Sequence, residues 1–136
     1  MYLTEIESHD ERANVFAQDL LSLMRTILAF DDNTLCGTVS WAIRGGMDDG
    51  VIEIIGLGVN DRYKRKGIAT RLVNQAIADA KERFQTKKHT LRRAFLFMEE
   101  SNHIARQFYL KYGFSEVAMI PKFYPEDGAS IFVIEL

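Results

Sequence analysis

The chain has 136 residues, of which 47% are hydrophobic and 26% charged, a balance typical of a globular protein with a buried core. Its net charge of -2 argues against bulk attraction to nucleic acid, and its single cysteine excludes an internal disulfide. No apolar run approaches the roughly 20 residues that span a bilayer, and the N-terminus lacks a signal-peptide pattern. We therefore expect one cytoplasmic domain over residues 1–136, with neither nucleic acid nor membrane as a partner.

The first third of the chain predicts a strand, a helix and a second strand. Tyr2–Ile6 is a short strand candidate, and Thr26–Phe30 is apolar and β-prone. Between them, Ser8 and Glu11 have the spacing of a capping box. Apolar residues then recur at helical spacing, so we expect a helix from Ser8 to about Met24.

Two further strands are predicted in the middle of the chain. Leu35–Ile43 alternates between apolar and small or polar residues, which indicates a half-buried strand. Val51–Val59 is apolar on both faces apart from Glu53, which indicates a central strand. Gly56 and Gly58 late in that strand indicate a β-bulge, or a ligand that approaches the backbone closely.

Glu53 is the unusual residue of this central strand. A buried carboxylate is costly unless it is paired or functional. Burial would raise its pKa, which suits a general base. Alternatively, the side chain reaches water at a cleft edge or pairs with an arginine.

The turn after this strand carries Arg62, Lys64, Arg65 and Lys66 and ends at Gly67, where a long amphipathic helix pattern begins and runs to about Phe84. A helix start presents unpaired N–H groups and a partial positive charge. Gly67 leaves those amides unobstructed, and the cations add attraction, so the turn predicts a phosphate site. A solvated basic turn is the alternative. The spacing matches neither a P-loop nor a dinucleotide fingerprint.

The last part of the chain predicts strands on either side of a short helix. Asn102 can cap this helix, and Gly113 can end it. Pro121–Gly128 reads as a loop with two exposed aromatic residues. The strand candidates are Arg92–Met98, Val117–Ile120 and Ser130–Leu136. Central strands that alternate with helices indicate an α/β architecture with a mixed sheet.

Two stretches together resemble the GCN5-related N-acetyltransferase (GNAT) family. The first is Lys64–Ala69, where the family has Gln/Arg-x-x-Gly-x-Gly/Ala at a helix start; Lys64 departs from that pattern but keeps a long polar donor. The second is a late helix signature made by Asn102, Ala105, Phe108, Tyr109, Gly113 and Phe114. The resemblance covers about Thr34 to Leu136. It implies a single-domain GNAT fold, with a mixed, mostly antiparallel central sheet flanked by helices.

The resemblance also implies acetyl-CoA as cosubstrate. Amides of the turn from Lys64 to Thr70 would bind its pyrophosphate, and the backbone of Leu57–Val59 would pair with its pantetheine arm. An N–H of Leu57 or Gly58 would steady the thioester oxygen. Asn102 would contact the arm, and Tyr109 would donate a proton to the departing thiolate. The implied cofactor-binding residues are Leu57, Gly58, Val59, Lys64, Arg65, Lys66, Gly67, Ile68, Ala69, Thr70 and Asn102. No metal is expected.

Glu53 is the expected catalytic base, acting directly or through a water. Its position resembles that of the glutamate in the histone-acetylating branch of the family. An amine with a pKa of ~10.4 must lose a proton before it attacks. Bacterial ribosomal-protein acetyltransferases carry a different glutamate, at the position that is Phe97 here.

The acceptor is expected to be a primary amine that attacks the thioester directly. Phe123, Tyr124 and Pro125 are similar to the aromatic loop of protein N-terminal acetyltransferases, which favours a peptide or protein amine, N-terminal or lysine. The alternatives are a small polyamine- or aminoglycoside-type substrate, or a non-catalytic module that senses acyl-CoA. Monomer and homodimer both stay open.

Overall fold

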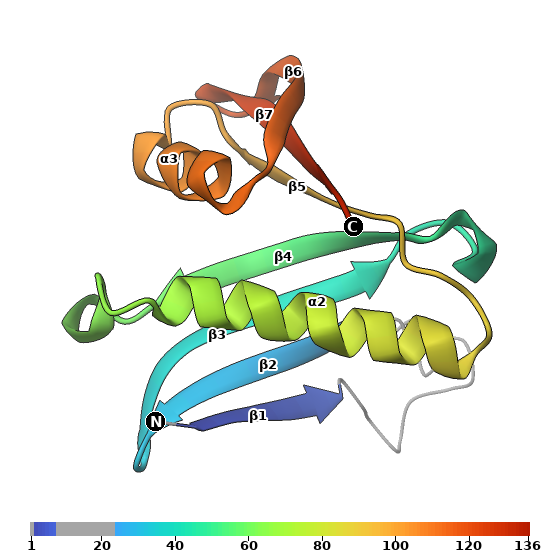
Figure 1. The fold of residues 1–136 in the computed structure, drawn as a ribbon. Coiled ribbons are helices and arrows are strands. Elements are labelled where there is room, and N and C mark those ends of the chain that lie inside the picture. The colour runs from blue at the N-terminus through green and yellow to red at the C-terminus, as the bar shows by residue number, and fades with distance from the viewer. Residues whose placement is uncertain (1, 8–23) are drawn as a thin grey trace, which may run out of the picture.

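In the computed structural model, residues 2–7 and 24–136 are described. Their strands form one seven-stranded sheet in the order β1-β2-β3-β4-β5-β7-β6 (Figure 1). The strands are β1 (Tyr2–Glu7), β2 (Met24–Asp31), β3 (Thr34–Ile43), β4 (Val51–Val59), β5 (Arg93–Glu99), β6 (Ser115–Tyr124) and β7 (Asp127–Glu135). The helices are α2 (Ile68–Thr86) and α3 (His103–Tyr112), with 3-10 turns η1 (Met47–Asp49) and η2 (Asp61–Tyr63).

The sheet splits between β4 and β5. These two strands are parallel, whereas the other neighbouring pairs are antiparallel, so the predicted mixed, mostly antiparallel sheet is confirmed. β4 and β5 pair at Val51–Glu53 with Arg93–Phe95, although both strands continue beyond this point. Past Glu53 they part, and Figure 1 shows the wedge that opens between them.

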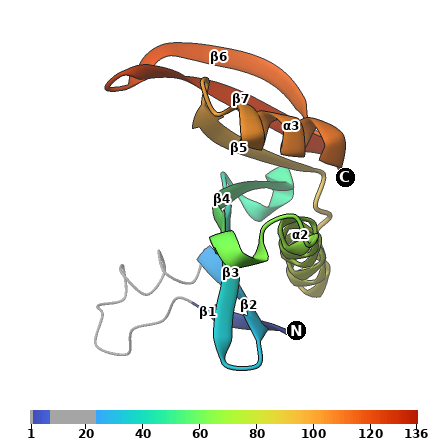
Figure 2. The same ribbon diagram turned by 90° about the vertical axis from the view of Figure 1, so that its left-hand side faces the viewer.

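Both described helices lie on one face of the sheet (Figure 2). The apolar stripe of α2 is buried against the strands and consists of Ile68, Leu72, Val73, Ala76, Ile77, Ala80 and Phe84. Trp41 Nε1 on β3 donates a hydrogen bond of 2.9 Å to Asp79 Oδ2 on α2. The Tyr112 hydroxyl on α3 donates to Asn74 Oδ1 on α2, so the two helices also contact each other. None of the helices in the described residues is long and apolar enough to cross a membrane.

The predicted bulge in β4 is confirmed. Ser40 pairs with Ile55 and Thr38 pairs with Gly58, so β4 has one more residue than β3 between these pairs. Gly56 in the extra stretch has φ +66°, a conformation that side chains other than glycine rarely adopt. The bulge bends the end of β4 at the point where the sheet splits.

The predicted loop Pro121–Gly128 is wrong in extent. β6 continues to Tyr124 and β7 starts at Asp127, so only a tight turn remains. A register shift between Ile120 and Tyr124 absorbs Pro121, which has no N–H to give, on an edge strand where that loss is tolerated. The expected helix from Ser8 lies in 8–23, outside the described residues, and Met24 begins β2.

Candidate active site

A groove of about 630 Å³ lies between the end of β4, the turn before α2, and α3. Its lining residues are Leu57, Gly58, Val59, Tyr63, Lys64, Arg65, Ala69, Asn102, Ile104, Ala105, Phe108 and Tyr109. The groove thus brings together most residues that the sequence predicted, from segments far apart in the chain. Among the other predicted residues, Ile68 is 2% exposed and packs in the core, so only its backbone can face a ligand.

The start of α2 has the geometry of an anion site. Gly67 is the N-cap residue with φ +76°, and the first turn of α2, all of it described, contains no acidic residue. A Cβ built on Gly58 or Gly67 would have nothing within 4 Å. The backbone therefore faces open space, and the amides of the first turn keep their capacity to donate. A phosphate-bearing cosubstrate fits this arrangement.

The turn ahead of Gly67 has its own internal contacts. Lys64 Nζ lies 2.9 Å from Asp61 Oδ1, and this contact lowers the pKa of the Asp61 carboxyl. Lys66 Nζ lies 5.4 Å from the centroid of the Tyr63 ring. The Tyr63 hydroxyl donates to Asp31 Oδ2 at 3.3 Å, which ties the turn to the β2–β3 hairpin.

Sequence reasoning missed Tyr63 as a groove residue. Tyr63 lies among cations in the sequence. Nothing in that pattern indicates that its hydroxyl donates a hydrogen bond to Asp31. Thr70 does not join the main groove; it lines a neighbouring hollow of about 610 Å³ with Asn74, Phe108, Lys111 and Tyr112. Phe108 lines both spaces.

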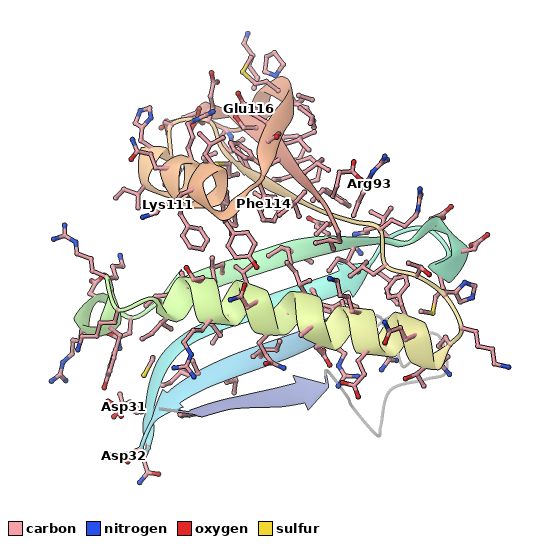
Figure 3. The ribbon with its side chains drawn as sticks, in the orientation of Figure 1. Asp31, Asp32, Arg93, Lys111, Phe114 and Glu116 are labelled. Atoms are coloured by element: carbon pink, nitrogen blue, oxygen red, sulfur yellow. The ribbon has the colours of Figure 1, made fainter. Side chains whose placement is uncertain are left out.

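Tyr109 on α3 is only 6% exposed but lines the groove. Its ring makes edge contacts with Phe108 and Phe114, at centroid distances of 5.0 and 5.2 Å. Figure 3 labels Phe114 at the boundary between α3 and α2. Burial raises the pKa of Tyr109 to about 12, so the phenol keeps its proton at any ordinary pH.

Asn102 lines the groove and also caps α3. Its Oδ1 accepts a hydrogen bond of 3.1 Å from the Ala105 N–H. The side-chain oxygen is therefore engaged by its own helix, and the amide NH₂ is the part with donors to offer.

Glu53 lies on the opposite face of β4 from the helices. Its neighbour Ile54 pairs with Trp41, which bonds to α2, so alternation turns Glu53 away from α2. Its side chain is 17% exposed and accepts a hydrogen bond of 2.8 Å from Arg44 Nε. The arginine pairing that the sequence left open is therefore what the structure shows.

Glu53 and Tyr109 do not share one face of the sheet. Glu53 pairs with Phe95 at the last paired position before β4 and β5 part. Glu53 therefore lies at the apex of the split, the point where β4 and β5 separate. The gap between the separated strands connects the two faces of the sheet, and Tyr109 lies on the face that carries the helices. Any chemistry that uses both residues must take place through this opening.

A split pair of parallel strands, beside a helix start that no side chain caps, is an arrangement that suits a protein with a phosphate-bearing cosubstrate. Residues 2–114 match the model of the acetyltransferase (GNAT) family, and the chain belongs to this family. It is an N-acetyltransferase, and acetyl-CoA is its cosubstrate. No curated protein matches the chain significantly by sequence.

Solved structures share this fold at low sequence identity. An IAA acetyltransferase from Bacillus cereus is 13% identical with a TM-score of 0.77, covering 99% of both chains. A GNAT acetyltransferase from Elizabethkingia anophelis with acetyl-CoA bound is 19% identical with a TM-score of 0.72, covering 98% of both. The ribosomal-protein-S18-alanine N-acetyltransferase from Escherichia coli is 17% identical with a TM-score of 0.71, covering 88% of this chain and 74% of its own.

Proposed function

We propose that the protein transfers the acetyl group of acetyl-CoA to the α-amine of a peptide or protein by direct attack. The observation that carries the proposal is the groove, which places the open start of α2, the end of β4 and Tyr109 around one space. Acetyl-CoA supplies a thioester whose carbonyl carbon accepts the amine and whose thiol departs.

The chain's backbone binds the cosubstrate in this proposal. Amides of the turn from Lys64 to Thr70 receive the diphosphate, assisted by the cations of the turn. The backbone of Leu57–Val59 runs alongside the pantetheine arm, which the bare Gly58 allows. An N–H of Leu57 or Gly58 donates to the thioester oxygen as negative charge develops there.

Tyr109 acts on the leaving group. A thiol has a pKa of ~8.5, more than three units below that of Tyr109 at about 12, so complete transfer of the phenolic proton to the thiolate is uphill. We assign to Tyr109 a hydrogen bond to the departing sulfur, which stabilises its negative charge without moving the proton fully.

Glu53 acts from the other face. The amine approaches at the apex, and Glu53 takes its proton, directly or through a water, while Arg44 shares the carboxylate. This arrangement suits an α-amine better than a lysine. An α-amine has a pKa of ~7.7–8.0 and is partly unprotonated at neutral pH, whereas a lysine amine has a pKa of ~10.4 and depends far more on a base.

The experiment is an assay of free CoA release with a panel of N-terminal peptides, lysine peptides, polyamines and aminoglycosides. We expect turnover with N-terminal peptides. Glu53→Gln is expected to lower kcat by roughly 10²-fold, the usual range for loss of a general base. Glu135→Gln is the matched control, because it also breaks a glutamate–arginine ion pair, the 2.7 Å contact with Arg93.

Two results would contradict the proposal. Turnover with polyamines or aminoglycosides alone would favour the small-molecule alternative. Acetyl-CoA that stabilises the protein against heat, without acetylation of any amine, would favour a sensor module.

A further inference from the structure

The C-terminal part of the sheet carries an aromatic row on the face away from α2 and α3. Side chains alternate along β5, so Phe95 and Phe97 share the face of Glu53, while Leu96 is 2% exposed in the core. The ring centroids of Phe95 and Phe97 are 5.9 Å apart at an interplanar angle of 77°. The row therefore begins beside the apex of the split and leads away from it.

Phe123 of β6 extends this row. Its ring stacks on Phe97 with a centroid distance of 5.7 Å and an interplanar angle of 9°. Phe97 is 36% exposed and Phe123 is 53% exposed. Two large rings stacked on each other, yet open to solvent, form an apolar surface that a monomer gains little from exposing.

The backbone next to this surface is open on one side. β5 pairs with β7 from Arg93 to Glu99, but its pairing with β4 ends at Phe95. Beyond Phe95, the edge of β5 that faces the split has backbone groups without a β4 partner. An extended peptide can use such groups through main-chain hydrogen bonds, whereas a small amine offers no matching backbone.

The charges on this face suit an ammonium group. Glu53 lies at one end of the aromatic row, and alternation along β5 places Glu99 on the same face at the other end. Arg93, also on this face, is neutralised by Glu135. Glu53 is likewise paired with Arg44, so among these residues Glu99 supplies the excess negative charge, which favours an ammonium group over a carboxylate on this face.

We infer that the Phe97–Phe123 surface binds the first side chain of the acceptor peptide and selects an N-terminal residue with a large apolar side chain. The inference rests on the function proposed above and narrows its substrate class. With the first side chain on the stacked rings, the α-amine lies toward the apex, near Glu53. Phe97 and Phe123 are then specificity-determining residues rather than catalytic ones.

A second copy of the chain is a less suitable occupant. The free edge of β6 contains Pro121, which lacks an N–H, and Lys122 in a left-handed conformation with φ +58°. Both features protect an edge strand against pairing with another sheet.

The test uses peptides of one sequence that differ only in the first residue: Phe, Leu, Met, Ser, Gly or Asp. We expect kcat/KM to be at least about tenfold higher for Phe, Leu and Met than for Ser and Gly, the range that an apolar pocket gives. Binding of the same peptides to protein loaded with free CoA, measured by calorimetry, gives a readout that does not depend on turnover, and the same order is expected there.

Phe97→Ser and Phe123→Ser should each reduce the preference for Phe over Ser to less than about threefold, mainly through KM, with the affinity for acetyl-CoA unchanged. Leu35→Ser is the matched control, because Leu35 is an exposed apolar residue, 43% accessible, on β3. It should keep the preference.

Each other outcome is decisive. Peptide acetylation without an apolar preference, or a preference that both serine variants keep, would overturn the inference and leave the proposed function standing. Acetylation of free aromatic amines but of no peptide would overturn both, as would the absence of any acetylation. A dimer in sedimentation experiments that Phe123→Ser dissociates would assign the surface to a second copy and overturn the inference.

Discussion

The two described helices begin in opposite ways. α3 closes its own start, because Asn102 Oδ1 accepts from the Ala105 N–H. The N-cap of α2 is Gly67, which has no side chain. The first turn of α2 lies within the described residues and contains no acidic residue. One helix satisfies a backbone donor internally, and the other leaves its donors for a ligand. α3 contributes side chains to the groove instead, and Tyr109 is the most important of them.

Because the two helix starts differ, substitutions at each should change different properties of the protein. Changes at the start of α2 should act on the affinity for acetyl-CoA, because only backbone is offered there. Changes in α3 should act on turnover or on stability, unless they place a negative charge at the groove. Each prediction below can break or sharpen this division.

The largest effect is expected for Tyr109→Phe. Loss of the hydroxyl should lower kcat by about 10²-fold or more, within the range for loss of a positioned hydrogen-bond donor to a developing negative charge. The dissociation constant for acetyl-CoA should change less than about threefold, because the phenyl ring keeps its contacts with Phe108 and Phe114. Steady-state kinetics and calorimetry measure the two quantities. A variant with unchanged kcat would remove Tyr109 from the chemistry.

The next largest effect is expected for Gly67→Asp. A carboxylate beside the α2 amides should repel the diphosphate and weaken acetyl-CoA binding by about 2–3 kcal/mol, on the order of a hundredfold, the value of charged hydrogen bonds. Gly67→Asn is the matched control, because both side chains tolerate a positive φ. It should weaken binding much less. Equal affinities of the two variants would show that the start of α2 does not hold the phosphates.

The pH dependence of stability should report the burial of Tyr109. In the unfolded chain its phenol ionises near pH 10, whereas in the folded protein it stays protonated until about pH 12. The stability that this group contributes is thus complete below pH 10 and is lost as pH rises toward 12. The difference is on the order of 2–3 kcal/mol. Urea unfolding between pH 9 and 12 should show a steeper loss for the wild type than for Tyr109→Phe.

The smallest effect is expected for Asn102→Ala. Loss of the cap should destabilise the protein by about 1 kcal/mol. Asn102→Asp should keep the stability, since aspartate caps equally well, but should weaken acetyl-CoA binding by placing a negative charge at the groove. Thermal unfolding and calorimetry separate these effects. Full stability of the alanine variant would mean that the cap has no energetic role.

Much of this architecture could be predicted from local sequence patterns. The apolar run of β4, the glycine bulge within it and the start of α2 after Gly67 each depend on residues close together in the chain. The residues of the groove on β4 and at Asn102 and Tyr109 were implied by the resemblance of two motifs to the GNAT family.

The remainder depends on contacts between distant segments. Arg44 pairs with Glu53 because antiparallel register brings β3 beside β4, and Asp31 reaches Tyr63 from a separate hairpin. The stack of Phe97 on Phe123 depends on β7 lying between β5 and β6, and on strand pairing that continues through Pro121. No local pattern encodes such pairings.

The split between β4 and β5 also has a kinetic consequence. The separated strands leave a gap in the sheet. Acetyl-CoA and the acceptor amine can therefore enter from opposite faces, and neither has to leave before the other binds. We therefore expect initial-velocity plots with intersecting lines, the sign of a ternary complex. Exchange of label between acetyl-CoA and free CoA should not occur while the acceptor is absent.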